Sequence, residues 1–274
     1  MSATPPPPRR RKVTTEALRR MKAKGIKISA LTAYDHQMAQ VLDLAGIDVI
    51  LVGDSVATVV QGRDSTVTVT MEHMLYHASI VSGAVARALV VGDLPFMSFQ
   101  VNSDEALRNA GRMVQESGVE AVKVEGGEKV APTVARIVDA GIPVMGHVGL
   151  TPQSIHKFGT YKVRATNPAE ADEVLAGARA LQDAGASAVV VEKVPAALGK
   201  RLADELEIPV IGIGAGPHCD GQILVSHDML GLYSKFHPRF VRRYASLGDE
   251  MQRAFESYVA DVKSGEFPTD DESY

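Results

Sequence analysis

Cysteine and long apolar runs are scarce in this sequence, and each deficit excludes a class of protein. The single cysteine, Cys219, cannot form an intramolecular disulfide and cannot build a cysteine-based metal site. We therefore expect the reducing environment of the cytoplasm. No run of about 18 apolar residues occurs, so neither a transmembrane helix nor a membrane partner is expected. The N-terminus also lacks the apolar core of a signal peptide.

An excess of charge of either sign is absent as well. The 274 residues include 29 Lys and Arg against 33 Asp and Glu, which gives a formal net charge of −4. This balance argues against a basic surface that binds nucleic acid. Hydrophobic residues make up 45% and charged residues 23% of the chain, a composition typical of a soluble globular enzyme and not of a disordered or fibrous protein.

Consecutive prolines and a short basic run set the first residues apart. Such a segment favours an extended backbone and does not enter a packed core. The arginines could form a targeting or anion-binding element, but they show no amphipathic pattern, so a solvated tail is favoured. The length allows one or two domains. We predict a flexible tail over residues 1–14 and a single catalytic domain over residues 15–274.

Short β-branched runs alternate with longer segments rich in Ala, Leu and Glu from Lys27 onward. This alternation predicts βα units and a parallel sheet. Gly46, Gly118, Gly141 and Gly185 each stand between a helical segment and the next strand, where glycine commonly closes a helix. The predicted strands are residues 28–32, 49–52, 89–91, 121–124, 144–146, 188–191, 210–213 and 223–225.

Eight evenly spaced strands favour an α/β fold of the (β/α)8 TIM-barrel type, with a doubly wound sheet as the minor alternative. Helices are expected between the strands, with extra helices at the N-terminal and C-terminal ends. The C-terminal helical region, residues 238–264, is rich in Arg, Tyr and Phe. We expect it to cover the barrel or to contact a neighbouring subunit.

The carboxyl ends of the strands, where a TIM barrel places its active site, are strongly polar. The residues there are Tyr34, Asp35, Asp54, Ser55, Asp93, Lys123, Glu125, His147, Glu192, Lys193, His227 and Asp228.

Three of these carboxylates, Asp54, Asp93 and Glu125, follow adjacent strands and should converge. Neighbouring carboxylates raise one another's pKa unless a cation compensates, and oxygen-only ligation suits Mg²⁺. The alternative is that each aspartate simply caps a helix or a turn. For the three together, the pattern favours a metal site.

Lys123 and Glu125 are two residues apart on one strand, so both should point into the barrel. Buried charges must be paired, either with each other in an interior salt bridge or with a metal or an anionic ligand. Glu192 ends an apolar strand, where a carboxylate can act as a general base. His147 could polarise a carbonyl group or be a structural histidine.

The glycine-rich string at 212–216 could cradle a phosphate, although a tight turn explains it equally well. The sequence has neither a Gly-x-Ser-x-Gly elbow nor a His-Glu-x-x-His helix, which excludes the usual hydrolases and zinc proteases.

Ordered strings along the chain resemble the ketopantoate hydroxymethyltransferase family. They are LTAYD at 31–35, LVGDS at 51–55, QGRDST at 61–66, DLPFM at 93–97, VKVEGGE at 122–128, GHVGLTPQS at 146–154 and IGIGAGPHCDGQILV at 211–225. Only the Pro/Arg-rich tail lies outside the resemblance.

The resemblance implies a TIM barrel, like that of phosphoenolpyruvate mutase, that transfers a hydroxymethyl group to 3-methyl-2-oxobutanoate. The donor would be 5,10-methylenetetrahydrofolate and the product 2-dehydropantoate, in the synthesis of pantothenate and coenzyme A. The reaction would pass through an enolate stabilised by Mg²⁺. The family forms homodecamers, so a homo-oligomer is expected.

Site roles also follow from the resemblance, position by position. One Mg²⁺ per subunit would be bound by Asp54, Asp93 and Glu125. The keto acid would contact Asp54, Ser55, Asp93, Lys123 and His147, and Glu192 would be the proton acceptor. Two alternatives stay open: a Mg²⁺-dependent carbon–carbon lyase or mutase acting on a 2-oxo acid, and an inactive barrel that serves as a binding module.

Some positions depart from the family pattern. Thr160 and Arg164 lie in the long loop after the fifth strand, where the family pattern reads GGYKVQGR. Lys193 follows Glu192 where a smaller neutral residue is common. We expect the first change to affect loop closure or folate affinity and not the metal site. The second places a cation beside Glu192 if its side chain turns inward.

Overall fold

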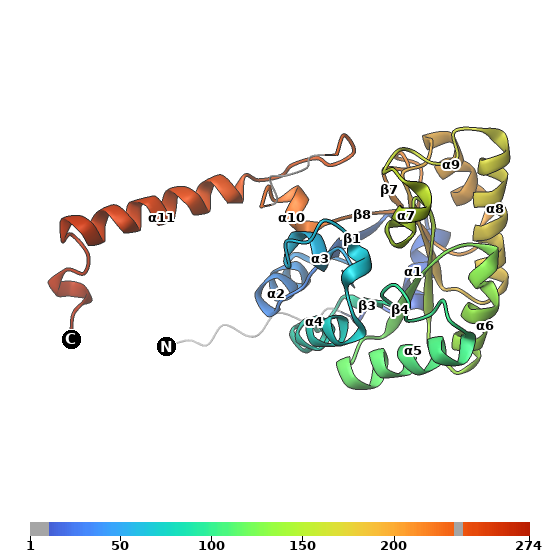
Figure 1. Cartoon of the computed structure of the whole chain (residues 1–274), viewed down its shortest axis with the longest axis horizontal. Coiled ribbons are helices and arrows are strands. Elements are labelled where there is room, and N and C mark those ends of the chain that lie inside the picture. Colours follow the sequence, from blue (N-terminus) through green and yellow to red (C-terminus); the bar gives the residue numbers. More distant parts are fainter. Residues whose placement is uncertain (1–10, 233–237) are drawn as a thin grey trace. The chain divides into compact units, whose positions relative to one another are not determined.

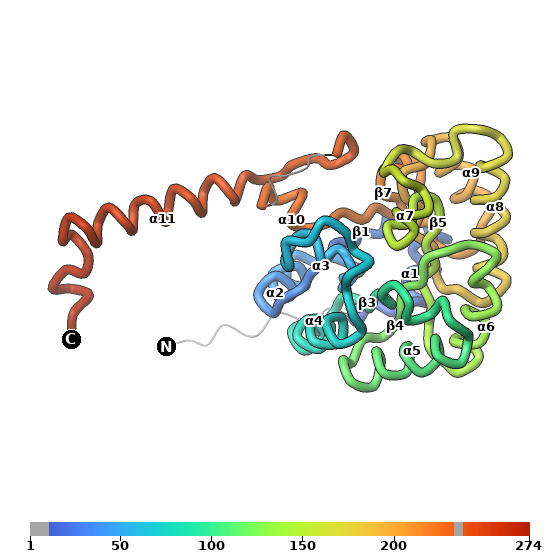
Figure 2. Tube along the Cα trace, viewed as in Figure 1, coloured from blue at the N-terminus to red at the C-terminus, as the bar shows by residue number. Residues whose placement is uncertain are grey.

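The computed structural model describes residues 11–232 and 238–274. Eight parallel strands close into a barrel in chain order, which confirms the predicted TIM barrel and excludes a doubly wound sheet. The strands are β1 (Ile28–Thr32), β2 (Val49–Val52), β3 (Leu89–Asp93), β4 (Ala121–Glu125), β5 (Val144–Gly149), β6 (Ala188–Glu192), β7 (Val210–Ile213) and β8 (Gly221–Leu224). Figure 2 shows the trace of the chain, coloured from blue at the N-terminus to red at the C-terminus, with β1, β3, β4, β5 and β7 labelled.

Helices surround the strands of the barrel (Figure 1). The α-helices are α1 (Thr15–Ala23), α2 (His36–Ala45), α3 (Val56–Val59), α4 (Met71–Ala84), α5 (Ser103–Ser117), α6 (Ala131–Asp139), α7 (Ile155–Phe158), α8 (Pro168–Asp183), α9 (Ala196–Glu205), α10 (Ser226–Met229) and α11 (Leu247–Ser264). Short 3-10 turns are η1 (Thr66–Thr68), η2 (Glu128–Val130), η3 (Pro152–Ser154) and η4 (Asp270–Glu272). Within the described residues, no helix has the length and apolarity needed to cross a membrane.

Internal contacts divide the chain into two compact units, which meet in the sequence at Leu224 and Val225. The first unit contains the barrel, and the second contains α10, α11 and η4. The single domain predicted over residues 15–274 spans both units and stays a prediction.

Several strands extend one or more residues beyond their apolar runs. Asp93 pairs in register with Lys123, and Glu125 pairs with His147, so these charged residues belong to the strands themselves. The backbone hydrogen bonds between strands do not depend on side-chain polarity, whereas the strand ends were predicted from the ends of the apolar runs. β8 was predicted at 223–225 but begins at Gly221, where a Cβ atom would lie 2.5 Å from the Ile28 carbonyl oxygen. A glycine is therefore needed for β1 to approach so closely.

The C-terminal helix was predicted over 238–264, but α11 begins only at Leu247. The backbone before it pairs elsewhere in the second unit. The N–H of Tyr244 donates to the Met229 carbonyl, and the N–H of Leu247 donates to the Leu230 carbonyl. These bonds replace the helical ones that the composition suggested.

Two apolar layers alternate along the strands, as a period of two requires. Inward side chains of β4 and its neighbours fill the barrel, and outward ones pack under the helices. Ala121 belongs to the inner layer, whereas Val122 and Val124 belong to the outer one. Lys123 and Glu125 are 3% and 5% exposed on the inward face, which confirms the orientation predicted for this strand.

Helix α1 and the residues before it close the amino end of the barrel. Leu18 and Val13 belong to the inner apolar layer. Lys22 donates to the carbonyl of Ile208 before β7 and pairs with Asp220 before β8 at 2.8 Å. Residues 1–10 of the predicted tail lie outside the described residues. The prediction of a free tail up to residue 14 is wrong at its end, because Val13 is buried and its N–H donates to the Arg87 carbonyl.

Shortening the Leu18 side chain tests whether α1 stabilises the amino end of the barrel. Leu18 is 1% exposed, so Leu18→Ala should lower the free energy of unfolding by about 2–5 kcal/mol. Leu44→Ala is the matched control, because Leu44 is 74% exposed on α2 and should cost less than about 0.5 kcal/mol. Urea denaturation measures both values. Equal losses for the two variants would show that α1 does not stabilise the barrel.

Candidate active site and metal centre

The barrel brings together the charged side chains that were predicted at the carboxyl ends of its strands. Asp54 follows β2, Asp93 ends β3, and Glu125 ends β4. His147 lies in β5 and Glu192 ends β6. Since all strands are parallel, these side chains gather at one rim of the barrel.

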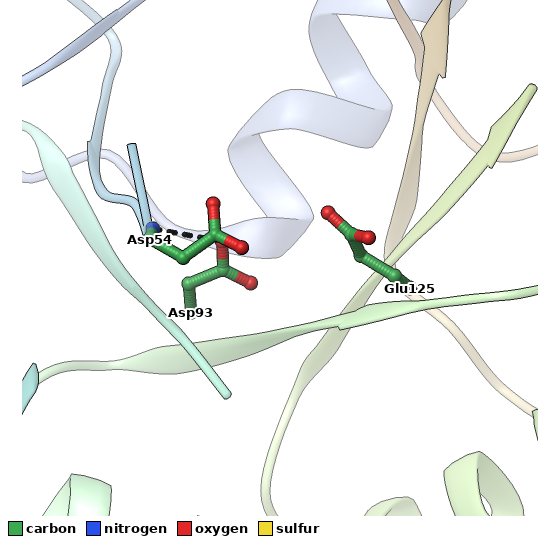
Figure 3. A group of neighbouring side chains, drawn as sticks. All are labelled: Asp54, Asp93 and Glu125. Carbon is green, nitrogen blue, oxygen red and sulfur yellow. Dashed lines mark hydrogen bonds between the residues drawn. The ribbon is translucent and has the colours of Figure 1, made fainter. Parts of the chain in front are cut away.

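Asp54, Asp93 and Glu125 form the candidate metal centre. One ligand atom of each lies within 4.8 Å of the others, and the three residues are only 4%, 1% and 5% exposed. Figure 3 shows the Asp54 and Asp93 carboxylates side by side, with Glu125 facing them. The N–H of Asp54 donates to Oδ2 of Asp93 at 3.2 Å, which fixes the two residues relative to each other.

The chemistry of these donors fits a hard cation such as Mg²⁺. Burial raises the pKa of Asp54 well above its usual value, and the charges of Asp93 and Glu125 raise it further. Oδ2 of Asp54 is buried and has no hydrogen-bond partner among the described residues. A buried carboxylate oxygen without a partner is costly, and a cation bound by three carboxylates would remove that cost.

Lys123 supplies positive charge next to these carboxylates. Its Nζ lies 2.7 Å from Oδ1 of Asp93 and 3.3 Å from Oε1 of Glu125. Burial opposes the charge of the ammonium, but the carboxylates outweigh it and raise the pKa of Lys123 above its usual value. The interior salt bridge considered in the sequence analysis is therefore present, next to the candidate metal centre.

His147 connects Glu125 with Glu192. Its Nδ1 lies 3.2 Å from Oε1 of Glu125, and its Nε2 lies 3.5 Å from Oε2 of Glu192. Burial and Lys123 disfavour the charged imidazolium, but contacts with the two carboxylates outweigh them and raise the pKa of His147 to about 9. A protonated ring places positive charge between the two carboxylates and attracts Glu192 by charge. Its Nε2 makes no hydrogen bond among the described residues.

Ser55 and Tyr34 form a pair at the end of β2 and β1. The Tyr34 hydroxyl lies 2.7 Å from the Ser55 Oγ, and Tyr34 is fully buried. Asp35 only caps α2, accepting the N–H of Met38. His227 and Asp228, predicted at the end of the eighth strand, lie in α10 of the second unit.

The glycines at 212–216 are explained by close packing in this part of the barrel. A Cβ atom at Gly216 would lie 2.4 Å from Cβ of Ala196, and one at Gly199 would lie 2.2 Å from the Ala215 carbonyl oxygen. The turn therefore packs directly on α9. Tight packing accounts for the string without any bound anion.

Gln153 is a residue whose role the sequence analysis missed. Its backbone N–H donates to Oε2 of Glu125 at 3.0 Å, and its side-chain amide donates to the Leu94 carbonyl at 3.0 Å. Gln100 donates to its Oε1 at 3.2 Å. Gln153 thus ties the ends of β3 and β4 together from η3. Its string, GHVGLTPQS, was noticed, but the contact depends on how the loop folds back and has no local signal.

Removing the Gln153 amide is expected to weaken metal binding. Gln153→Leu keeps the backbone N–H that donates to Glu125 but removes the side-chain bond to the Leu94 carbonyl that holds this backbone in place. Partners behind metal ligands typically contribute 10–100-fold to affinity, so the Mn²⁺ dissociation constant should rise by about tenfold or more. Calorimetry on the metal-free protein measures it. Gln182→Leu is the matched control, because Gln182 accepts two backbone N–H groups near Glu207, away from this rim. An unchanged constant in Gln153→Leu would refute the positioning role.

The fold and the site together define a TIM-barrel enzyme with a candidate metal centre. Solved structures share this fold at low sequence identity. Phosphoenolpyruvate phosphomutase from Streptomyces platensis subsp. rosaceus matches with a TM-score of 0.61 at 17% identity, covering 92% of this chain and 88% of that chain. Phosphonopyruvate hydrolase matches with a TM-score of 0.63 at 12% identity, covering 96% and 91%. These neighbours confirm the predicted phosphoenolpyruvate mutase-like barrel.

Sequence comparison is more specific. Residues 12–270 match the family model described as ketopantoate hydroxymethyltransferase. The 3-methyl-2-oxobutanoate hydroxymethyltransferase of Chlorobium phaeobacteroides is 58% identical over 266 residues, covering 96% of both chains. That of Porphyromonas gingivalis is 56% identical over 262 residues, again covering 96% of both. The chain belongs to the ketopantoate hydroxymethyltransferase family.

Proposed function

We propose that this protein transfers a hydroxymethyl group from 5,10-methylenetetrahydrofolate to 3-methyl-2-oxobutanoate and releases 2-dehydropantoate. This is the first step of the pantoate branch of pantothenate and coenzyme A synthesis. The names of the relatives support the activity. The observation that carries the proposal is the convergence of three buried carboxylates and Lys123 at the rim of the barrel.

Asp54, Asp93 and Glu125 would hold one Mg²⁺. When bound, this ion would place positive charge beside the keto oxygen, where negative charge grows as the neighbouring carbon loses its proton. The unpartnered Oδ2 of Asp54 supports this assignment.

The keto acid would bind next to the carboxylates and within reach of Lys123, which stays paired with Asp93 and Glu125. The Lys123 ammonium is a buried cation next to the centre and would pair with the substrate carboxylate. The Ser55 hydroxyl, held by Tyr34, would hydrogen-bond to the substrate from the turn after β2. Asp54, Asp93 and His147 are the further substrate contacts that the family resemblance implies.

Glu192 would accept the proton from the third carbon of the keto acid. Its side chain is 15% exposed, so it is accessible from the mouth of the barrel, and its Oε2 lies 3.5 Å from the His147 Nε2. A positioned base contributes roughly 10²–10⁴ in rate. The carbon that loses the proton would form a bond to the methylene carbon of the folate. Both bonds from this methylene carbon to folate nitrogens would break, and water would supply the hydroxyl group. The two freed nitrogens would take up the proton collected by Glu192 and one proton from water, which leaves tetrahydrofolate.

The alternative function, a carbon–carbon lyase, would be favoured by a thiol at the mouth of the barrel. Cys219 instead lies in the turn between β7 and β8, where it is fully buried. Its Sγ is 2.8 Å from where a Cβ of Gly212 would lie, so it fills a packing position. We therefore retain the transferase over the lyase.

A homo-oligomer, a homodecamer by family resemblance, and a cytoplasmic location complete the proposal. Helix α11 has an apolar face with none of its residues buried. Met251, Phe255 and Val259 recur every four residues and line a groove of the second unit together with Leu232. A second copy of the chain would cover this face. Light scattering after size-exclusion chromatography tests it, and a monomer would refute the assembly.

Proton NMR of 3-methyl-2-oxobutanoate in deuterated water tests the activity. With protein and Mg²⁺, the hydrogen on the third carbon should exchange for deuterium, and EDTA should stop the exchange. Adding 5,10-methylenetetrahydrofolate should then give 2-dehydropantoate. If the keto acid binds but neither exchange nor transfer occurs, the barrel is inactive and serves only to bind. Cleavage of the keto acid would favour the lyase instead.

A further inference from the structure

Two departures from the family pattern, far apart in sequence, meet in the structure. The backbone N–H of Arg164 donates to the Lys193 carbonyl at 2.8 Å. The Lys193 ammonium donates to the Tyr161 carbonyl at 2.7 Å. The loop that contains Thr160 and Arg164 is therefore tied twice to the residue that follows Glu192.

The backbone of Lys193 is fixed from both sides. Its N–H donates to the Ile213 carbonyl of β7 at 2.8 Å, and the preceding Glu192 carbonyl accepts the N–H of Leu150 at 2.9 Å. Lys193 has a φ of 48°, a left-handed conformation that few residues other than glycine adopt. This conformation turns the chain at the end of β6 so that the Lys193 side chain ends on the loop.

Arg164 anchors the far end of the same loop. Its guanidinium pairs with Glu170 at the start of α8 and lies over the Phe158 ring, 4.3 Å from the centroid. The segment between Phe158 and Arg164 thus has fixed ends, and Lys193 holds its middle at Tyr161.

Tyr161 lies at the entrance of the candidate active site, because its carbonyl accepts from the ammonium of Lys193, the residue that follows Glu192 at the end of β6. Its side chain is half exposed, and the Lys193 Nζ lies 5.9 Å from the centre of its ring. Burial raises the pKa of the Tyr161 phenol, and the charges of Asp54 and Glu192 raise it further. The phenol therefore stays neutral, and the side chain, which is 45% exposed, leaves surface that a ligand can contact.

We propose that Lys193 is a positioning residue that holds Tyr161 at this entrance, and that the Tyr161 ring contacts the ring system of methylenetetrahydrofolate. The inference rests on the proposed function, because the folate must bring its methylene carbon to the keto acid from the open side of the barrel. Its flat aromatic rings are the chemistry that a half-exposed tyrosine recognises by offset stacking.

The test separates the folate step from the keto-acid step in the full-length protein. Lys193→Met keeps the length of the side chain but removes the donor to the Tyr161 carbonyl. It should raise the KM for methylenetetrahydrofolate by about tenfold. The folate-independent deuterium exchange of the keto acid should stay within about twofold of wild type, since the bonds of Asp54, Glu125 and Glu192 are untouched. Lys200→Met, on an exposed lysine of α9 that pairs with Asp204, is the matched control and should change neither value.

Two further variants sharpen the result. Lys193→Arg keeps a donor at this position and should restore most of the folate KM. Tyr161→Ala should raise that KM as Lys193→Met does, again without slowing the exchange. An unchanged folate KM in Lys193→Met would overturn the inference. An equal loss of exchange and transfer would overturn it as well, because Lys193 would then act on Glu192.

A spectroscopic readout makes the inference independent of activity. The chain has no tryptophan, so Tyr161→Trp creates a single reporter in the loop. Tetrahydrofolate should quench its fluorescence, and adding Lys193→Met should lower its anisotropy. An unchanged anisotropy would show that Lys193 does not hold the loop. If wild-type protein shows no exchange and no transfer, the proposed function fails, yet the anisotropy still decides whether Lys193 positions residue 161.

Discussion

Glu192→Gln is expected to reduce both the deuterium exchange of the keto acid and hydroxymethyl transfer by about 10²–10⁴. Glutamine keeps the shape of the side chain and its place beside His147, whose Nε2 lies 3.5 Å from Glu192. It cannot take a proton from the substrate carbon. Proton NMR of the exchange and a coupled transfer assay measure the two losses separately.

The same variant should bind metal normally, because Glu192 lies on the far side of His147 from the Asp54, Asp93 and Glu125 centre. Mn²⁺ titration followed by electron paramagnetic resonance checks this. Glu173→Gln, an exposed position on α8, is the matched control and should be fully active. Exchange at more than a tenth of the wild-type rate in Glu192→Gln would assign the base to another group.

The barrel and most of its site could be predicted from the sequence, because both follow from strand periodicity. Apolar runs mark strands, and parallel strands place the residues that follow them at one rim. Asp54, Asp93 and Glu125 lie at the carboxyl ends of adjacent strands and are therefore neighbours in any closed parallel barrel. The inward direction of Lys123 followed from the same period of two.

Contacts made by loops could not be predicted in this way. Gln153 reaches Glu125 only because η3 folds back over the end of β4. Lys193 was recognised as unusual, yet its partner is the Tyr161 carbonyl, which carries no signal in the side-chain pattern. The start of α11 was missed because its preceding backbone bonds to residues near Met229 instead of continuing the helix. These features depend on long-range backbone hydrogen bonds.

The substrate could not be derived from the site residues either. Three carboxylates, a lysine and a base suit many reactions of 2-oxo acids, and structures with the same fold include a mutase and a hydrolase. The family resemblance supplied the keto acid and the folate. The geometry adds information on which groups are positioned to bind a charged ligand and which are positioned to move a proton.

Lys123→Met is expected to destabilise the metal-free protein by about 3–5 kcal/mol at pH 7, the usual result of removing one partner from a buried ion pair. Asp93 and Glu125 would lose the ammonium that lies 2.7 Å and 3.3 Å from them. Urea denaturation in EDTA measures the change. Lys129→Met, on an exposed lysine of η2, is the matched control and should alter stability by less than about 0.5 kcal/mol.

The pH dependence of this loss identifies its electrostatic origin. Burial disfavours ionised Glu125, but Lys123 and His147 outweigh it and hold its pKa at about 2. A carboxyl pKa below its unfolded value of about 4.3 stabilises the fold above that pH, and the stabilisation disappears as the pH falls toward 2. Lys123→Met removes the largest attraction on ionised Glu125. The difference in the free energy of unfolding between variant and wild type should therefore be largest near pH 7 and should narrow below about pH 4.

Added Mg²⁺ should stabilise Lys123→Met more than wild type, because the ion would neutralise carboxylates that the variant leaves unpaired. Thermal unfolding with Mg²⁺ and with EDTA, for both proteins and for Lys129→Met, measures the difference. A stability difference between variant and wild type that is constant with pH and unaffected by Mg²⁺ would mean that Lys123 acts through packing alone. A stability difference that disappears at low pH and on addition of Mg²⁺ would mean that Lys123 and the cation stabilise the same three carboxylates. Lys123 would do so from inside the barrel, and the cation from its mouth.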